Sequence, residues 1–65
     1  MTVSELKDVS WQHCLTTGGQ WRKVAVMEEV EYLGIPCIRV YAHVDDVNVH
    51  EMYIAKAQLV SLEEI

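Results

Sequence analysis

The side chains best able to bind a metal ion lie in the middle of the chain: Cys37, His43, Asp45 and His50. Zinc needs Cys, His or carboxylate ligands that converge in a tetrahedron, usually at tight, paired spacing. Here the two histidines are seven positions apart, and the hairpin register favoured below places them on opposite faces. Because the number of ligands falls short, the sequence predicts no metal site and no other cofactor.

Covalent catalysis would need a cysteine or serine beside a positioned base. Cys14 follows His13, but adjacent residues point apart on a helix or a strand. Cys37 follows Pro36 among apolar neighbours, which is typical of a small core residue. No set of acid, base and nucleophile converges, so we expect a protein that is not an enzyme.

Apolar and polar residues alternate from Ile38 to Ile54, interrupted by a polar break at Asp45–Asn48. A period of two predicts strands with one buried face. The residues of the inward parity before the break are Ile38, Val40, Ala42 and Val44. Arg39 and Tyr41 fall on the outward face.

Two loop lengths are open for this hairpin. A four-residue loop, Asp45–Asn48, sets His43 opposite His50 and turns Glu51 inward. A three-residue loop keeps the inward face apolar, and we favour it because a one-residue slip moves every side chain to the other face. It pairs Ala42 with Met52 and Val40 with Ile54 inside. On the outer face it pairs His43 with Glu51 and Tyr41 with Tyr53.

We expect this outward face to be the binding surface, formed by Arg39, Tyr41, Tyr53, His43 and Glu51. Tyrosine and arginine are enriched at binding hot spots. The alternative interpretation is an ordinary cross-strand aromatic pair that stabilises the hairpin. The expected partner is another protein or a second copy of the chain in a homodimer. Trp21 and Tyr32 are expected to cap the core, as large aromatics do.

The net charge is −5, from five Lys and Arg against ten Asp and Glu. Nucleic-acid affinity comes largely from basic side chains that neutralise phosphates, so a nucleic-acid partner is not expected. An alternative function is an acidic decoy or regulator, of the kind found in phages or mobile elements. It would engage a basic protein surface through Glu28, Glu29 and Glu31.

The 65 residues are expected to form a single domain, residues 1–65, with a hydrophobic share of 51%. No basic segment followed by an apolar run marks a signal peptide. No apolar run approaches the roughly 20 residues of a membrane span, so no membrane partner is expected. Cys14 and Cys37 have no pairing motif, which favours a cytoplasmic protein with reduced thiols.

Thr2 and Glu5 have the spacing of a capping box, which predicts a helix from Ser4 to Leu15 within an N-terminal segment, residues 1–19. The glycine pair that follows would end it. The alternation over Val9–Leu15 leaves a strand as the alternative.

Residues 20–65 are expected to form a β-barrel or meander. A long strand begins at Trp21 and bends near Glu28, with a helix over residues 20–33 as the alternative. The later predicted elements are a turn at Leu33–Pro36, strands at Cys37–Val44 and Val49–Ala55, a helical turn at Lys56–Gln58, and a short strand at Leu59–Leu62.

This order resembles SH3-like small barrels over Trp21–Leu62, on the segments Tyr32–Cys37 and Tyr53–Leu59. The chain lacks the aromatic-rich acidic loop by which proline-binding SH3 domains are identified, so that activity is not implied. The resemblance implies a mainly β fold. We expect an N-terminal helix followed by a small SH3-like barrel or a strongly bent antiparallel sheet of four to five strands.

Overall fold

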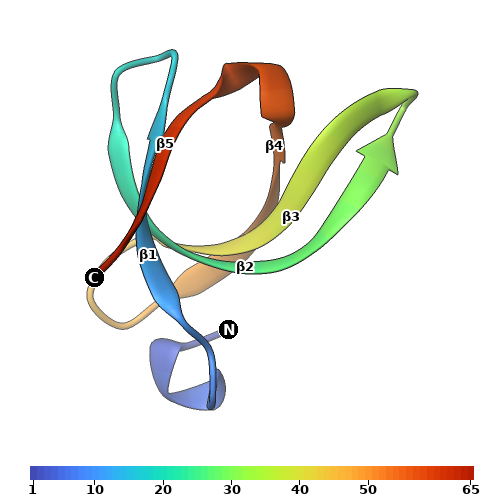
Figure 1. Ribbon diagram of the computed structural model, residues 1–65. Helices are drawn as coiled ribbons and strands as arrows, with labels where there is room; N and C mark the ends of the chain where they lie inside the picture. The colour runs from blue at the N-terminus through green and yellow to red at the C-terminus, as the bar shows by residue number, and fades with distance from the viewer.

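The computed structural model describes residues 1–65 and contains one antiparallel sheet of five strands (Figure 1). The strands are β1 (Trp11–Thr16), β2 (Trp21–Tyr32), β3 (Ile35–His43), β4 (Val49–Ala55) and β5 (Leu59–Glu64). Two short 3-10 turns, η1 (Val3–Glu5) and η2 (Lys56–Gln58), precede β1 and β5. The strand order is β4-β3-β2-β1-β5, so β4 and β5 form the two edges and the sheet is open. The expectation of a mainly β, antiparallel fold is confirmed.

The predicted helix from Ser4 to Leu15 is wrong. The capping box does form, and the Thr2 backbone N–H donates to Glu5 Oε1 at 3.3 Å, but it caps only the single turn η1. From Trp11 the chain is instead a strand paired on both sides, with β2 and with β5. Short isolated helices are marginal in water, so strand pairing and burial of Cys14 decide the conformation.

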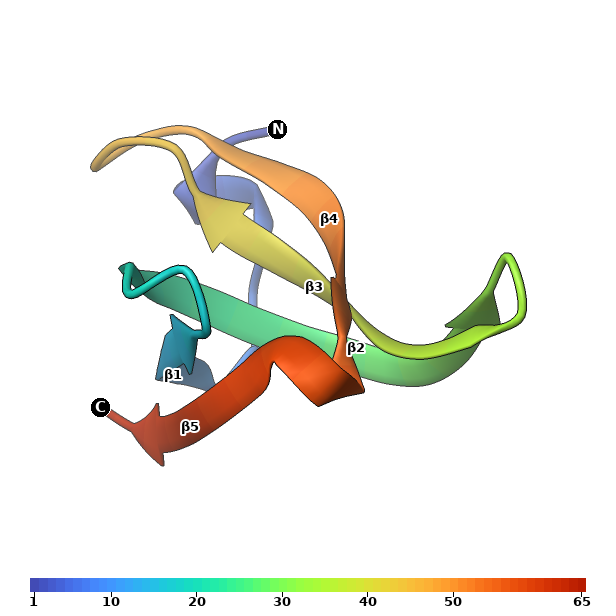
Figure 2. The ribbon, with the colours of Figure 1, turned by 90° about the horizontal axis from the view of Figure 1, so that it is seen from above.

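The long strand β2 is confirmed, and the alternative helix over residues 20–33 is wrong. β1 pairs only with Trp21–Ala25, whereas β3 pairs with β2 as far as Tyr32. The register shifts between Val26 and Glu28, which marks a β-bulge near the predicted bend. Bulges bend a strand and increase its twist. Figure 2 shows the first part of β2 alongside β1 and its second part in the curved β2–β3 hairpin.

A two-residue loop, Leu33 and Gly34, joins β2 to β3. Both residues have positive φ angles, 53° and 78°, as the turns that match the twist of a two-residue hairpin require. The predicted turn at Leu33–Pro36 is therefore two residues too long, because Ile35 and Pro36 already belong to β3.

The bounds of β4 agree with the predicted strand, but the β3–β4 register does not. Ala42 lies opposite His50 and Val40 opposite Met52, so both loop lengths weighed from the sequence are wrong. Asp45 explains the longer loop, because its carboxylate accepts the N–H groups of Val47 and Asn48 at 2.8 and 2.7 Å.

Compared with the favoured three-residue loop, the observed pairing of β3 with β4 is shifted by two residues along β4. A shift of two keeps every side chain on its face and changes only its cross-strand neighbours. Val44, predicted to point inward, lies in the loop and is exposed.

The core lies on the inward face of the sheet. Its buried residues are Cys14, Val24, Ile38, Val40, Ala42 and Ile54, with Val26, Met52, Leu59 and Leu62 packed against them. On the outward face Ala25, Cys37 and Val49 are also buried. The N-terminal segment is attached beside Val49, whose N–H donates to the Met1 carbonyl at 2.9 Å.

Truncation of Val40 tests this assignment of faces. Val40 has no exposed surface, so V40A should lower the free energy of unfolding by about 2 kcal/mol through lost apolar burial and a cavity. V60A removes the same atoms from a side chain that is 59% exposed and should change stability by less than about 0.5 kcal/mol. Chemical denaturation measures both, and equal effects would contradict the assignment.

Candidate functional site

The predicted alternation of inward and outward side chains in β3 is confirmed. Ile38, Val40 and Ala42 are buried on the inward face, while Arg39 and Tyr41 point outward and remain partly exposed. The outward face of β2, β3 and β4 is therefore the surface on which the predicted binding residues lie.

Arg39 lies between two glutamates on the neighbouring strands. Its Nε donates to Glu28 Oε1 and its Nη1 to Glu51 Oε2, both at 2.9 Å. The hydrogen bonds that Arg39 donates to Glu28 and then to Glu51 raise the pKa of its guanidinium above the ordinary value. The register explains the arrangement, because Glu28 is directly opposite Arg39. These exposed pairs contribute little stability, but they hold the Arg39 side chain in one orientation.

Tyr53 stacks on Tyr32, with ring centroids 4.8 Å apart and planes inclined by 5°. The predicted pairing of Tyr53 with Tyr41 is wrong, because the observed register sets Tyr53 opposite Arg39 and Tyr41 opposite Glu51. Tyr32 was predicted to cap the core and is instead about half exposed. Tyr32 lies two positions beyond Val30 on the outward face, beside the two-residue turn. A correct register would have placed it on this face from the sequence.

His43 does not pair with Glu51, which corrects another predicted contact. It lies opposite Val49, and its ring packs edge-on against Trp11 with centroids 4.5 Å apart. Nδ1 is 3.1 Å from the Asp45 carbonyl oxygen, and Nε2 is buried without a hydrogen-bond partner. His43 therefore belongs to the packing between β1 and the β3–β4 loop.

The three glutamates of the predicted acidic patch do not act as one surface. Glu28 lies on the outward face with Arg39, whereas Glu29 lies opposite Ile38 and pairs with Lys56 Nζ at 3.0 Å. Glu31 is exposed. The alternating strand thus divides the acids between two faces and brings a cation to two of them.

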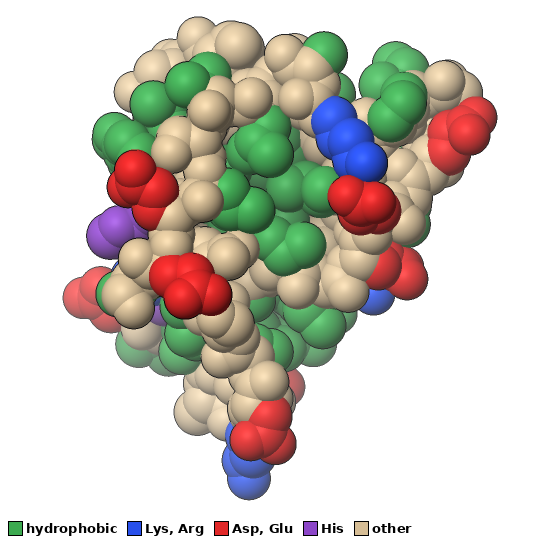
Figure 3. Space-filling view, viewed as in Figure 1, with side chains coloured by type: hydrophobic (Ala, Val, Ile, Leu, Met, Phe, Trp, Pro, Cys, Tyr) green, Lys and Arg blue, Asp and Glu red, His purple; other side chains and the backbone are tan.

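Exposed apolar side chains gather at the end of the β2–β3 hairpin. This hairpin-tip cluster consists of Tyr32, Leu33, Ile35 and Tyr53, which are 49%, 83%, 51% and 41% exposed. The hairpin projects beyond the other strands in Figure 1, and green side chains lie at its tip in Figure 3. Trp21, also predicted to cap the core, is exposed at the opposite part of β2.

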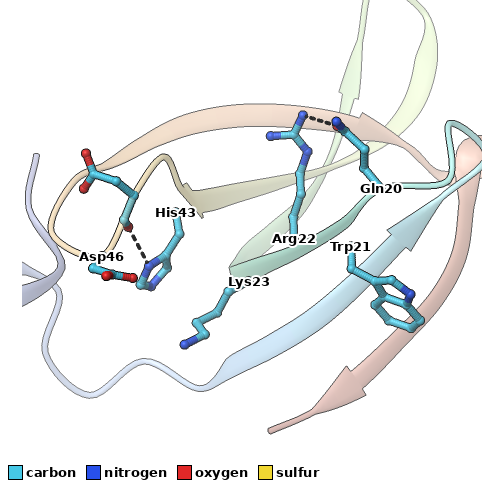
Figure 4. A pocket seen from close by; sticks show the side chains of 7 residues that line it. Gln20, Trp21, Arg22, Lys23, His43 and Asp46 are labelled. Atoms are coloured by element: carbon cyan, nitrogen blue, oxygen red, sulfur yellow. Dashed lines mark hydrogen bonds between the residues drawn. The ribbon is translucent and has the colours of Figure 1, made fainter.

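A shallow hollow of about 460 Å³ lies between the start of β2 and the β3–β4 loop. Its lining includes two cations, Arg22 and Lys23, and two anions, Asp45 and Asp46. Figure 4 shows Arg22 directed toward Gln20, to which it donates a hydrogen bond of 2.9 Å, while Lys23 points the other way. The two cations therefore do not converge on one point of the hollow.

Cys14 and Cys37 are buried and unpaired, as expected for Cys37 from its neighbours. Burial raises the pKa of the Cys14 thiol, against a smaller opposing effect of Arg22. A buried thiol with a raised pKa is a poor nucleophile at neutral pH. The structure contains no group of three or more side chains placed to hold a metal ion. None of its helical turns has the length or apolar character to cross a membrane.

Comparison with family models, with curated proteins and with solved structures found no match to this chain.

Asp45 gives the β3–β4 loop a testable pH dependence. Hydrogen bonds from Asn48 and Val47 lower the pKa of the Asp45 carboxyl below its ordinary value of 3.8. The stability from this ionised group is complete above the unfolded-state pKa and is lost as pH falls through the lower folded-state pKa. D45N should therefore remove part of the acid sensitivity of unfolding below about pH 4, measured by denaturation at several pH values.

Asp46 is the matched control, because it is the exposed neighbour in the same loop and its carboxylate accepts no hydrogen bond. D46N should leave the acid sensitivity close to that of the unsubstituted chain. The same result for D45N would show that the Asp45 turn does not stabilise the loop.

Proposed function

We propose that this chain is a non-enzymatic binding module that contacts a protein partner through the outward face of the β2–β3 hairpin and β4. The observation that carries the proposal is the conformation and exposure of Leu33 at the centre of the hairpin-tip cluster.

Leu33 is unfavourable for folding in two ways. Its φ of 53° lies in the left-handed region, where a residue with a Cβ costs about 1–2 kcal/mol and asparagine or glycine is preferred. Its side chain is almost fully exposed, so it gains little from apolar burial. A residue that breaks a local rule without a structural gain points to a functional site. A partner that covers Leu33 would supply the missing burial.

The surroundings of Leu33 have the composition of a binding surface. Tyr32 and Tyr53 form a stacked pair, and tyrosine and arginine are enriched among residues that dominate binding energy. The Arg39 ion pairs with Glu28 and Glu51 form a polar margin next to this apolar centre. Interfaces commonly have an apolar core and a polar rim.

The residues predicted from the sequence take unequal parts in this proposal. Tyr53 lies at the centre of the proposed surface, and Arg39 and Glu51 belong to its polar margin. Tyr41 lies on the same face, in the middle of the sheet. His43 packs on Trp11 and lies near the other end of β3, so it stands outside the proposed contact.

For the fold, we propose the SH3-like small barrel as the finer description. Its support is the meander order, the bulged β2 that pairs with β1 at one end and β3 at the other, and the 3-10 turn between β4 and β5. A cytoplasmic location stays a prediction, as does self-association through the proposed surface.

The acidic decoy has weaker support. Glu28 and Glu29 each have a cation at about 3 Å and project from opposite faces of β2, which reduces the charge that a basic partner would meet. An acidic contact should weaken steeply with added salt, whereas an apolar contact should not. Salt dependence of any captured partner therefore separates these two functions.

Substitution of Leu33 by asparagine should change stability and binding in opposite directions. L33N relieves the left-handed strain and should raise the free energy of unfolding by about 1 kcal/mol. The same variant should lose the partner or the self-association that the unsubstituted chain shows, measured by affinity capture and light scattering.

V60N is the matched control, because Val60 is an exposed apolar residue of β5 outside the cluster. It should retain binding. The proposal is wrong if L33N, and L33N combined with Y53A, keep every partner and the oligomeric state of the unsubstituted chain.

A further inference from the structure

One part of β2 has a free hydrogen-bonding edge. β1 pairs with β2 only as far as Ala25, while β3 continues along its other side to Tyr32. From Glu28 to Tyr32, β2 therefore has a strand neighbour on one side only. An exposed strand edge presents unpaired N–H and C=O groups that can pair with another chain.

Pro36 shows which backbone groups face that edge. In an antiparallel pair, residues that exchange both hydrogen bonds alternate with residues that exchange none. Proline has no N–H, so the Glu31–Pro36 pair belongs to the second kind. Two residues further along, the Glu29–Ile38 pair is of the same kind. The N–H and C=O groups of Glu29 and Glu31 therefore point away from β3, toward the open side.

A second copy of the chain is a poor occupant for this edge. Antiparallel pairing of two copies would set glutamates at 29 and 31 against the same glutamates of the other copy. Like charges directly opposite each other destabilise a sheet. The Glu29 carboxylate already pairs with Lys56 Nζ at 3.0 Å, which leaves Glu31 as the acidic side chain available to a new cation. Glu31 lies two residues along on the same side, is exposed, and makes no ion pair.

We propose that the edge of β2 at Glu29 and Glu31 binds an extended protein segment that carries basic side chains. The segment pairs with the four outward backbone groups, and a lysine or arginine side chain of the segment meets the Glu31 carboxylate. Addition of a strand to an exposed edge is a common mode of peptide recognition, in which backbone bonds supply affinity and side chains supply specificity. This surface is separate from the hairpin-tip cluster, so the inference goes beyond the proposed function.

Amide hydrogen exchange of the full-length, isotope-labelled chain tests the proposal. The probe is a short capped peptide of alternating lysine and valine, and the control is the same peptide with glutamate in place of lysine. At saturating lysine peptide, the amides of Glu29 and Glu31 should exchange about tenfold more slowly. Those of Val30 and Tyr32, already bonded to β3, should change little. The glutamate peptide should protect none of them.

Two variants separate backbone from charge. E31P removes an outward N–H without removing a β2–β3 bond and should abolish protection at Glu29. E31Q keeps the N–H and should weaken the lysine peptide several-fold, with less dependence on salt. Val30 exchange reports whether the hairpin is intact, and E31Q decides the test if E31P disturbs it.

L33N should bind the lysine peptide as the unsubstituted chain does, so failure here is distinguishable from failure of the hairpin-tip proposal. Absence of protection at Glu29 and Glu31, protection confined to another strand, or equal protection by the glutamate peptide would each overturn the inference.

Discussion

The structure depends on burial of a few inward side chains between the two halves of one curved sheet. One half is β3 with β4, the other is β1 with β5, and β2 lies between them. Only nine residues are buried, and Val24 and Val40, fully enclosed on adjacent strands, lie at the centre. A chain of 65 residues has a small core and a narrow margin of stability. The sheet must therefore bend to cover these side chains, and the β-bulge next to Val26 allows β2 to join both halves.

The same bend explains why function is proposed at the hairpin. Beyond the bulge, β2 and β3 extend past β1 and expose the outward face near Tyr32 and one strand edge. At the tip the side chains are exposed, whereas Cys37 and Ile38, further along β3, are buried. Leu33 keeps a conformation that asparagine would adopt at lower cost, while Arg39 is fixed by its glutamate neighbours. The proposed binding surface lies at the exposed tip of the hairpin.

The sequence predicted the long β2, the bounds of β4 and the inward face of β3 because alternation is a strong local signal. It favoured a helix where β1 forms and kept a strand over Val9–Leu15 only as the alternative. The capping box at Thr2 is a true local signal whose reach is one turn, whereas strand pairing is non-local. The outward contacts failed for one reason. Asp45 closes a five-residue loop, Val44–Asn48, by hydrogen bonds that residue patterns do not reveal. Because of the resulting shift of two residues, the aromatic neighbour of Tyr53 is Tyr32 and not Tyr41.

That register also decides which aromatic and charged groups form the proposed surface. Cross-strand nuclear Overhauser effects in solution test it most directly, because they report short distances between the rings of Tyr53 and its neighbours. Strong effects are expected between the ring protons of Tyr53 and Tyr32, with the backbone of Tyr53 opposite Arg39. Strong effects between Tyr53 and Tyr41, with none to Tyr32, would contradict both the register and the surface built on it.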